Sequence, residues 1–481
     1  MRHIALFLPI AHAWLYSSGQ DLFTNMHGPS VKLRCVNWYG AHMELFVSNG
    51  LELRSCGFIA DQIKSSGANC VRIPLSVQLV RDNPSPPPWA IAGLSDCNAT
   101  TALGVLDCQV HELTSRGLMV ILNNHNSFAG WVGSHENFSQ GLWNLPGYPT
   151  SDWVSSLASL ARRYRNNSRV VGLDIRNEIH DQNGTTVTWG QSDDVNSDWR
   201  AASMLADAAI REANPDILVI VSGLCMGYDL RAMQDLDNYR FKFVFTTHVY
   251  TYSWWFLQVD WNVVLVVGSV MALASALVAA WVATEKTPYS EMGYNDVMCL
   301  VYIVTASVLA PVLGLAFSLV WKFQSNKVGC SSIAADADPL LWVSVAWLTL
   351  ALASLCILVN IENIFKWRLQ TFWFCVWNTF IGALLVLFSL WFRTYGAVQW
   401  DLRRWHSSNI PVFVGEFGTK VGDNRVEWGW LMKHIEHMHY AYWALNGRRW
   451  RDNRWVDEEF GLLAQDWGSM RNPDWTKTIF K

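Results

Sequence analysis

The sequence predicts an α/β protein that folds as a (β/α)8 TIM barrel, interrupted between its sixth and seventh strands by a four-helix transmembrane bundle. Eight short runs rich in Val, Ile, Leu and Phe recur outside one long apolar block. Such near-continuous runs are typical of parallel strands buried on both faces. The runs are Val31–Trp38, Ala68–Pro74, Leu118–His125, Val170–Glu178, Ile217–Leu224, Phe241–Tyr250, Ile410–Gly418 and His439–Gly447.

Helical segments alternate with these strands. We expect helices over Gly57–Ser66, Thr101–Arg116, Trp153–Tyr164 and Trp199–Ala213, before the second to fifth strands, and another over Gln399–His406. Strand and helix repeated in this way predict a parallel sheet that closes into a barrel.

The charge balance excludes several classes of protein. Lys and Arg number 36 against 40 Asp and Glu, for a net charge of −4, whereas a nucleic-acid partner requires a basic surface. A hydrophobic content of 51% excludes a disordered chain. Ten cysteines are too few for a disulfide scaffold. Cys97 and Cys108 flank a short loop, and they either form a disulfide or remain unrelated thiols.

The long apolar block predicts a membrane insert over residues 255–395. It holds four runs, about 262–284, 297–321, 341–361 and 371–392, each long enough to cross a bilayer as a helix. The alternative is four buried helices of a globular core. An even number of spans returns the chain to the same side, so that residues 20–254 and 396–481 complete one catalytic barrel.

The first residues favour the extracellular or lumenal side for that barrel. A short positive start and an apolar stretch over residues 1–19 are typical of a signal peptide. Four glycosylation sequons begin at Asn98, Asn137, Asn166 and Asn183. Together with the insert, these features predict a multi-pass membrane glycoprotein.

Polar side chains stand where the predicted strands end. The carboxyl ends of barrel strands share one mouth, where catalysis occurs in this fold. A carboxylate is costly to bury there unless it is paired or hydrogen-bonded. The candidates are Arg72, His125, Asn177, Glu178, His248, Tyr250, Glu416 and Trp443.

These strand ends resemble glycoside hydrolase family 5, the cellulase-type family of retaining enzymes. The matching strings include Val71-Arg72-Ile73-Pro74, Ile175-Arg176-Asn177-Glu178, Thr247-His248-Val249-Tyr250 and Val414-Gly415-Glu416-Phe417-Gly418. Further matches are Leu33 to Trp38, Asn123 to Asn126 and Trp443 to Gly447. Two positions depart from the family pattern: Cys35 stands where Gly is usual, and Asn123 where an acid is common.

The resemblance implies a role for each candidate. Glu178 would be the acid/base and Glu416 the nucleophile of a double displacement, which needs two carboxyl groups about 5–5.5 Å apart. Arg72 and Tyr250 would stabilise the charge of Glu416. For the substrate, the expected ligands are Asn177 at the sugar 2-hydroxyl and Trp443 as an apolar floor. His125 and His248 would hold hydroxyls or orient the glutamates.

Several alternatives stay open at this point. The insert follows a barrel strand and therefore emerges at the catalytic face, which predicts a lipid bilayer near the cleft and a glycolipid such as glucosylceramide or a steryl glucoside as one possible substrate. The other is a β-glucan cleaved by an anchored enzyme. A membrane-anchored, non-catalytic carbohydrate-binding protein on a degenerate barrel is the non-enzyme alternative. No cofactor, metal, nucleic acid or protein partner is predicted.

Overall fold

The computed structural model describes residues 14–24, 28–131, 140–230, 233, 242–250, 410–423 and 425–481. The chain divides into two compact units, one made of Met1–Thr251 with Leu402–Lys481 and the other of Tyr252–Asp401. All described residues belong to the first unit. The predicted helix over 399–406 lies outside them.

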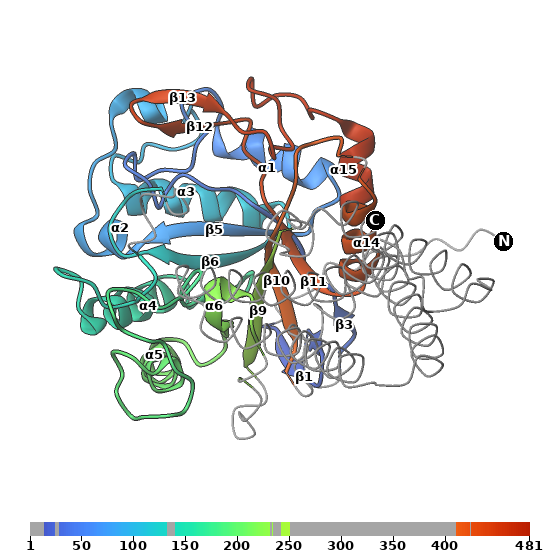
Figure 1. Cartoon of the computed structure of the whole chain (residues 1–481). Helices are drawn as coiled ribbons and strands as arrows, with labels where there is room; N and C mark the ends of the chain where they lie inside the picture. The colour runs from blue at the N-terminus through green and yellow to red at the C-terminus, as the bar shows by residue number, and fades with distance from the viewer. Residues whose placement is uncertain are drawn as a thin grey trace, which may run out of the picture. The chain divides into compact units, whose positions relative to one another are not determined.

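Eight parallel strands close into a barrel, which confirms the predicted (β/α)8 architecture (Figure 1). The barrel order is β10-β11-β4-β5-β6-β7-β8-β9, so the chain goes once around before β11 closes onto β4. The strands are β4 Arg34–Asn37, β5 Cys70–Ser76, β6 Met119–Asn126, β7 Val170–Asp174, β8 Leu218–Ser222, β9 Phe243–Val249, β10 Val412–Phe417 and β11 His439–Tyr442.

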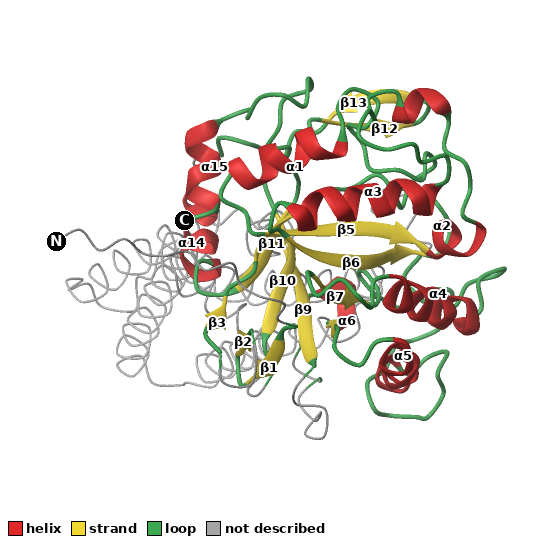
Figure 2. Cartoon of the chain, turned by 180° about the vertical axis from the view of Figure 1, so that it is seen from behind, coloured by secondary structure: helices red, strands yellow, loops and turns green. Residues whose placement is uncertain are grey.

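Helices cover the outside of the barrel strands, as Figure 2 shows for α1, α3, α4 and α5. These four are α1 Cys56–Ser65, α3 Ala102–Ser115, α4 Thr150–Arg163 and α5 Trp199–Ala213, within a few residues of their predicted bounds. Ser55, Thr101 and Asp198 cap three of them by accepting a backbone N–H of the first turn. The remaining helices are α2 Val77–Asp82, η1 Pro88–Ile91, α6 Leu224–Gly227, α14 Val426–Ile435 and α15 Pro473–Ile479.

A small antiparallel sheet precedes the barrel. It consists of β1 Tyr16–Ser18, β2 Asp21–Phe23 and β3 Ser30–Val31. Leu15 and Leu22 are buried in one apolar cluster with residues of the barrel interior such as Leu33 and Phe413. Burial of these leucines stabilises the sheet against the barrel.

The predicted signal peptide over residues 1–19 finds no support in the structure. Residues 1–13 lie outside the described part, and Tyr16–Ser18 pair with Asp21–Phe23 as strand β1. The predicted glycosylation is likewise unsupported.

The prediction of a multi-pass membrane protein requires correction. Across the described ranges, the structure contains no helix with both the length and the apolar character needed to cross a bilayer. The four apolar runs on which the prediction depended, 262–284, 297–321, 341–361 and 371–392, lie outside the described residues. The membrane localisation is therefore not retained.

A β-hairpin follows the last barrel strand. Its strands are β12 Arg448–Arg451 and β13 Arg454–Asp457, joined by Asp452 and Asn453 in left-handed backbone conformations. In Figures 1 and 2 the hairpin lies toward the end of the barrel to which β5 and β6 point. This is the end at which the strand-terminal polar residues lie.

Two disulfides join described residues. Cys97 is bonded to Cys108, one of the two outcomes that the sequence left open. Cys35 and Cys70 are bonded across the neighbouring strands β4 and β5, a pair that the sequence did not reveal. A cross-link limits the freedom of the unfolded chain and thereby favours the folded state.

The Cys97–Cys108 bond closes a loop with a sequence separation of 11, for which loss of the bond costs about 3 kcal/mol. We expect the free energy of unfolding, measured by urea denaturation, to fall by that amount in Cys97→Ser. The double variant Cys97→Ser/Cys108→Ser serves as the control and should lose no more, since the same bond is absent from both. Unchanged unfolding midpoints would contradict a stabilising role for this bond.

Candidate active site

The carboxyl ends of the barrel strands bring all eight predicted site residues to one mouth. Arg72 belongs to β5, His125 to β6, His248 to β9 and Glu416 to β10. Asn177 and Glu178 follow β7, Tyr250 follows β9, and Trp443 follows β11 directly. The parallel register of β9 and β10 pairs His248 with Glu416, which fixes these two side chains as neighbours.

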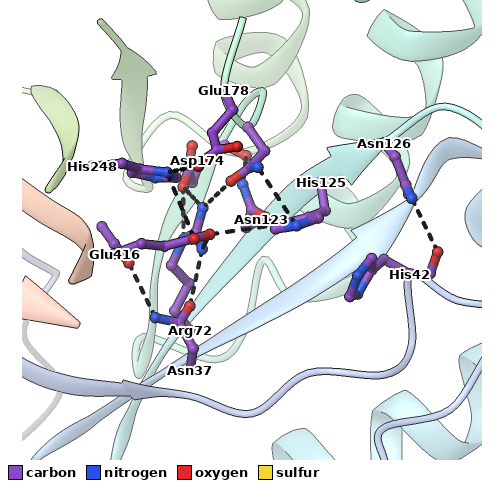
Figure 3. A network of polar contacts seen from close by, with 12 residues as sticks. Asn37, His42, Arg72, Asn123, His125, Asn126, Asp174, Glu178, His248 and Glu416 are labelled. Atoms are coloured by element: carbon purple, nitrogen blue, oxygen red, sulfur yellow. Dashed lines mark hydrogen bonds and ion pairs between the residues drawn. The ribbon is translucent and has the colours of Figure 1, made fainter. Parts of the chain in front are cut away.

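Two carboxyl groups from opposite sides of the barrel meet in this mouth (Figure 3). An oxygen of Glu178, an oxygen of Glu416 and a ring nitrogen of His248 all lie within 4.8 Å of one another. The spacing of the two carboxyl oxygens is close to the 5–5.5 Å typical of retaining glycosidases and below the roughly 6.5–9.5 Å of inverting ones. A separation this short suits direct attack of one carboxylate on the anomeric carbon of a sugar.

The Arg72 guanidinium is fully buried and bonds side chains from four directions (Figure 3). Its Nη1 lies 2.7 Å from Glu416 Oε1 and donates to Asn37 Oδ1 at 2.9 Å. Its Nη2 donates to Asn177 Oδ1 at 2.9 Å, and its Nε donates to Asp174 Oδ2 at 2.9 Å. Asp174 is itself fully buried, so it balances a charge that water cannot reach.

Glu416 is held by two donors and is almost fully buried. Tyr250 donates its hydroxyl to Glu416 Oε2 at 2.9 Å, opposite the bond from Arg72 to Oε1. Burial raises the pKa of Glu416 above its ordinary value, while His248 and Arg72 act in the opposite direction. Both donors favour the ionised carboxylate, which is the form that a nucleophile needs.

Glu178 lies in a different environment. Its side chain is 23% exposed, and His248 Nδ1 lies 2.9 Å from its Oε1. Burial is the main cause that raises the pKa of Glu178, to about 7. Its backbone φ of +40° is in the left-handed region, which is strained for a residue with a side chain. Strand β7 ends at Asp174, so Glu178 lies in the segment after the strand, where the backbone is not constrained by the sheet.

His248 lies between the two carboxyl groups as a neutral imidazole. Its Nδ1 is 2.9 Å from Glu178 and 3.7 Å from Glu416. Burial lowers the pKa of His248 to about 4 and outweighs the opposite effect of Glu416. Near neutral pH the ring is therefore uncharged, and it forms a neutral hydrogen bond with Glu178 instead of an ion pair.

His125 faces the mouth from β6. Its Nδ1 lies 2.9 Å from Asn123 Oδ1, and Asn177 Nδ2 lies 3.5 Å from its Nε2. Burial, with the nearby His42 and Arg72, keeps the pKa of His125 well below its ordinary value. An amide oxygen at Nδ1 places the ring proton there, so Nε2 is an acceptor, and a hydroxyl can replace its long contact with Asn177.

Aromatic rings form one wall of the mouth. Trp443 stacks on Tyr39 with ring centroids 4.7 Å apart and an interplanar angle of 8°. Trp131 meets Trp443 edge-on at 6.4 Å. Flat aromatic faces suit the C–H face of a sugar ring, so this cluster extends the floor that Trp443 alone was predicted to form.

Sequence reasoning missed several members of the site. Asp174, Asn37 and Asn123 hold the predicted residues in place, and Tyr39 supports Trp443. Asp174 did carry a signal: an acid inside an apolar strand needs a buried partner. Nothing in the sequence indicated which cation that partner is.

Glu178, His248 and Glu416 are also the only group of three or more His, Cys, Asp or Glu in the described ranges that converges closely enough to hold a metal ion. Their bonds to each other, to Arg72 and to Tyr250 already account for this arrangement. The sequence-based expectation of a metal-free site remains a prediction.

Comparison with known proteins now places the chain in a family. The Cellulase family model (glycosyl hydrolase family 5) matches residues 37–285. The chain belongs to this family, and it is a glycoside hydrolase by family. The resemblance noted in the sequence is thereby confirmed.

Individual relatives are endoglucanases. An endoglucanase of Paenibacillus polymyxa is 32% identical over 209 residues, 44% of this chain and 50% of the relative. The major extracellular endoglucanase of Xanthomonas campestris is 28% identical over 221 residues, 46% of this chain and 43% of the relative. The chain thus spans about half the length of the curated relatives that it matches.

Solved structures agree on the fold. The catalytic domain of the Xanthomonas campestris enzyme superposes with a TM-score of 0.56 at 19% identity, covering 97% of this chain and 99% of that one. An endocellulase of Pyrococcus horikoshii gives 0.56 at 17% identity, covering 98% and 100%. At these identities the likeness establishes the barrel fold alone.

The environment of Glu178 predicts the alkaline limit of activity. An acid catalyst must be protonated, and a pKa of about 7 means that Glu178 loses its proton as the pH rises through that value. We expect kcat/KM to fall about tenfold per pH unit above pH 7. This decline above pH 7, the alkaline limb of the pH profile, should disappear in Glu178→Gln. The substrate for this assay is an aryl glycoside, whose leaving group needs no proton.

Glu212→Gln is the control for this pH profile. Glu212 is exposed on α5, so its loss changes the same type of residue without reaching the mouth. An alkaline limb that persists in Glu178→Gln would assign the titration to another group.

Proposed function

We propose that the protein is a retaining endo-β-glucanase that cleaves β-glucosidic bonds by double displacement. The approach of the Glu178 and Glu416 carboxyl oxygens within 4.8 Å is the observation that carries this proposal. The endoglucanase names of the relatives support a glucan as the substrate. A cleft that cuts within a chain must accept sugars on both sides of the scissile bond.

In the first step the ionised Glu416 attacks the anomeric carbon. Glu178 donates its proton to the leaving oxygen, and the bond from that oxygen to the anomeric carbon breaks. Arg72 and Tyr250 hold the two oxygens of Glu416, which aims the carboxylate and keeps it charged. The product is a covalent glycosyl ester on Glu416.

In the second step a water molecule replaces the leaving sugar. Glu178, now ionised, removes a proton from this water as it attacks the anomeric carbon, and the ester bond to Glu416 breaks. Two inversions give net retention. Glu178 must change its protonation state twice in each cycle, which suits a pKa of about 7.

The remaining predicted residues bind the sugar. Arg72 holds the Asn177 oxygen, so that the Asn177 Nδ2 is left to donate to the 2-hydroxyl. His125 accepts a hydroxyl at Nε2, and Trp443 lies under the apolar face of the ring. Each role depends on an orientation that a neighbouring side chain already fixes.

Two other expectations receive less support. A non-catalytic carbohydrate-binding protein on a degenerate barrel has no need for two opposed carboxyl groups and a buried Arg72, and all three are present here. The relatives that the chain matches give no support to a glycolipid substrate.

The test is chemical rescue of the nucleophile. Glu416→Ala should lose activity on a soluble β-1,4-glucan by a factor on the order of 10⁴, because no covalent intermediate can form. Azide fills the space of the missing carboxylate and should restore cleavage of an aryl β-cellobioside. The glycosyl azide formed should have the inverted α configuration by NMR.

The control is Glu212→Ala, which removes an exposed carboxylate far from the mouth and should leave activity unchanged. Full activity of Glu416→Ala, or a rescued product of β configuration, would overturn the assignment of Glu416. Turnover of glucosylceramide in vesicles with no cleavage of the glucan would overturn the substrate class.

A further inference from the structure

The hairpin after β11 presents three of its four arginines on one of its two faces. Residues that pair directly across an antiparallel hairpin point to the same side. The register pairs Arg449 with Val456 and Arg451 with Arg454. Arg449, Arg451 and Arg454 therefore share one face, and the alternate residues, such as Trp450, point to the other.

This arginine face is turned toward the mouth of the barrel. The guanidinium carbon of Arg449 lies 4.5 Å from the centre of the Trp131 ring, and that of Arg451 lies 6.0 Å from it. Trp131 in turn meets Trp443 edge-on at 6.4 Å. Trp131 thus lies between the arginine face and Trp443, the floor of the proposed sugar site.

The positive charge of this face is only partly balanced. Glu458 pairs with Arg449 at 2.9 Å and also accepts the Tyr39 hydroxyl. Among the described residues, Arg451 has a single ion pair, with Asp452 at 3.4 Å, and that carboxylate is 74% exposed. Arg454 is exposed and takes part in no ion pair within the part of the chain that the structure describes.

Neighbouring acids do not supply the missing charge, because each has another partner. Asp457 pairs with Arg471 at 2.9 Å, and Glu459 pairs with Lys420 at 2.8 Å. Glu52 pairs with Arg448 at 3.3 Å. Like charges placed opposite each other destabilise a hairpin, so the pairing of Arg451 with Arg454 gains from an anion bound between them.

We propose that Arg451 and Arg454 bind a carboxylate carried by the glycan, on a sugar beyond the ring that meets Trp131. The preferred substrate would then be an acidic β-glycan in place of a neutral one. Guanidinium groups suit this task because their planar N–H groups match the two oxygens of a carboxylate. The inference rests on the proposed endoglucanase function and adds the chemical class of its substrate.

The experiment compares two soluble celluloses of equal chain length, one carboxymethylated and one hydroxyethylated. For Arg451→Gln/Arg454→Gln we expect the ratio of kcat/KM on the anionic substrate to that on the neutral one to fall roughly three- to tenfold, the size expected for two exposed ion pairs. In the unmodified protein the same ratio should decline with added salt, because salt screens exposed charges.

The matched control is Arg162→Gln/Arg165→Gln. This variant removes the same charge from two exposed arginines, one in the last turn of α4 and one just after it, at the opposite end of the barrel strands. It should leave the ratio unchanged. Arg454→Glu alone is a second test, since Arg454 is exposed and its substitution disturbs no packing. The ratio should fall further in this variant.

A ratio that stays constant in the hairpin variants, or an equal loss on both substrates, would overturn the proposal. A binding measurement tests this inference independently of the proposed function. Catalytically inactive Glu416→Gln should be retarded in a native gel containing carboxymethylcellulose, and the added hairpin substitutions should abolish the retardation. A protein that hydrolyses neither cellulose but shows this retardation would contradict the endoglucanase function and support the anion site.

Discussion

The buried guanidinium of Arg72 is the interaction on which the arrangement of the mouth depends. Its donors reach Asp174 on β7, Asn37 on β4, Glu416 on β10 and Asn177 after β7. A buried cation is tolerated only when its donors are satisfied, so the surrounding strands must present acceptors in one geometry. That requirement fixes Glu416 and Asn177 before any substrate arrives.

The two glutamates differ because their donors differ. Glu416 receives a charged donor from Arg72 and a hydroxyl from Tyr250, and both favour its ionised form. Burial raises the pKa of both carboxyl groups, but Glu178 has a neutral imidazole, His248, at 2.9 Å in place of a charged donor, and its pKa is about 7. The proposed nucleophile and the proposed acid/base thus lie within 4.8 Å of each other in different environments. Since the two carboxyl groups differ in their hydrogen-bond partners, the motif Asn177-Glu178 alone does not reveal this difference.

The sequence predicted the barrel well because each strand of a parallel sheet is buried on both faces and leaves a local apolar signal. It predicted the strand-end residues for the same reason, as polar groups that interrupt such runs. Features that depend on distant pairing were not predicted: the Cys35–Cys70 bond and the choice of Arg72 as the partner of Asp174. The positive φ of Glu178 was not predicted either. The apolar start of the chain lies mostly outside the described residues, so the signal peptide stays a prediction.

The base and the tip of the hairpin after β11 differ in how they connect to the mouth. Glu458, buried beneath the hairpin, joins Arg449 to the Tyr39 hydroxyl, and Tyr39 stacks on Trp443. The base of the hairpin is therefore part of the wall of the mouth and resists change. At its tip, Arg451 and Arg454 make no ion pair with Glu178 or Glu416 in the part of the chain that the structure describes. In the proposed anion site, charge at the tip therefore alters which glycan the cleft prefers, while the donors around the two carboxyl groups stay in place.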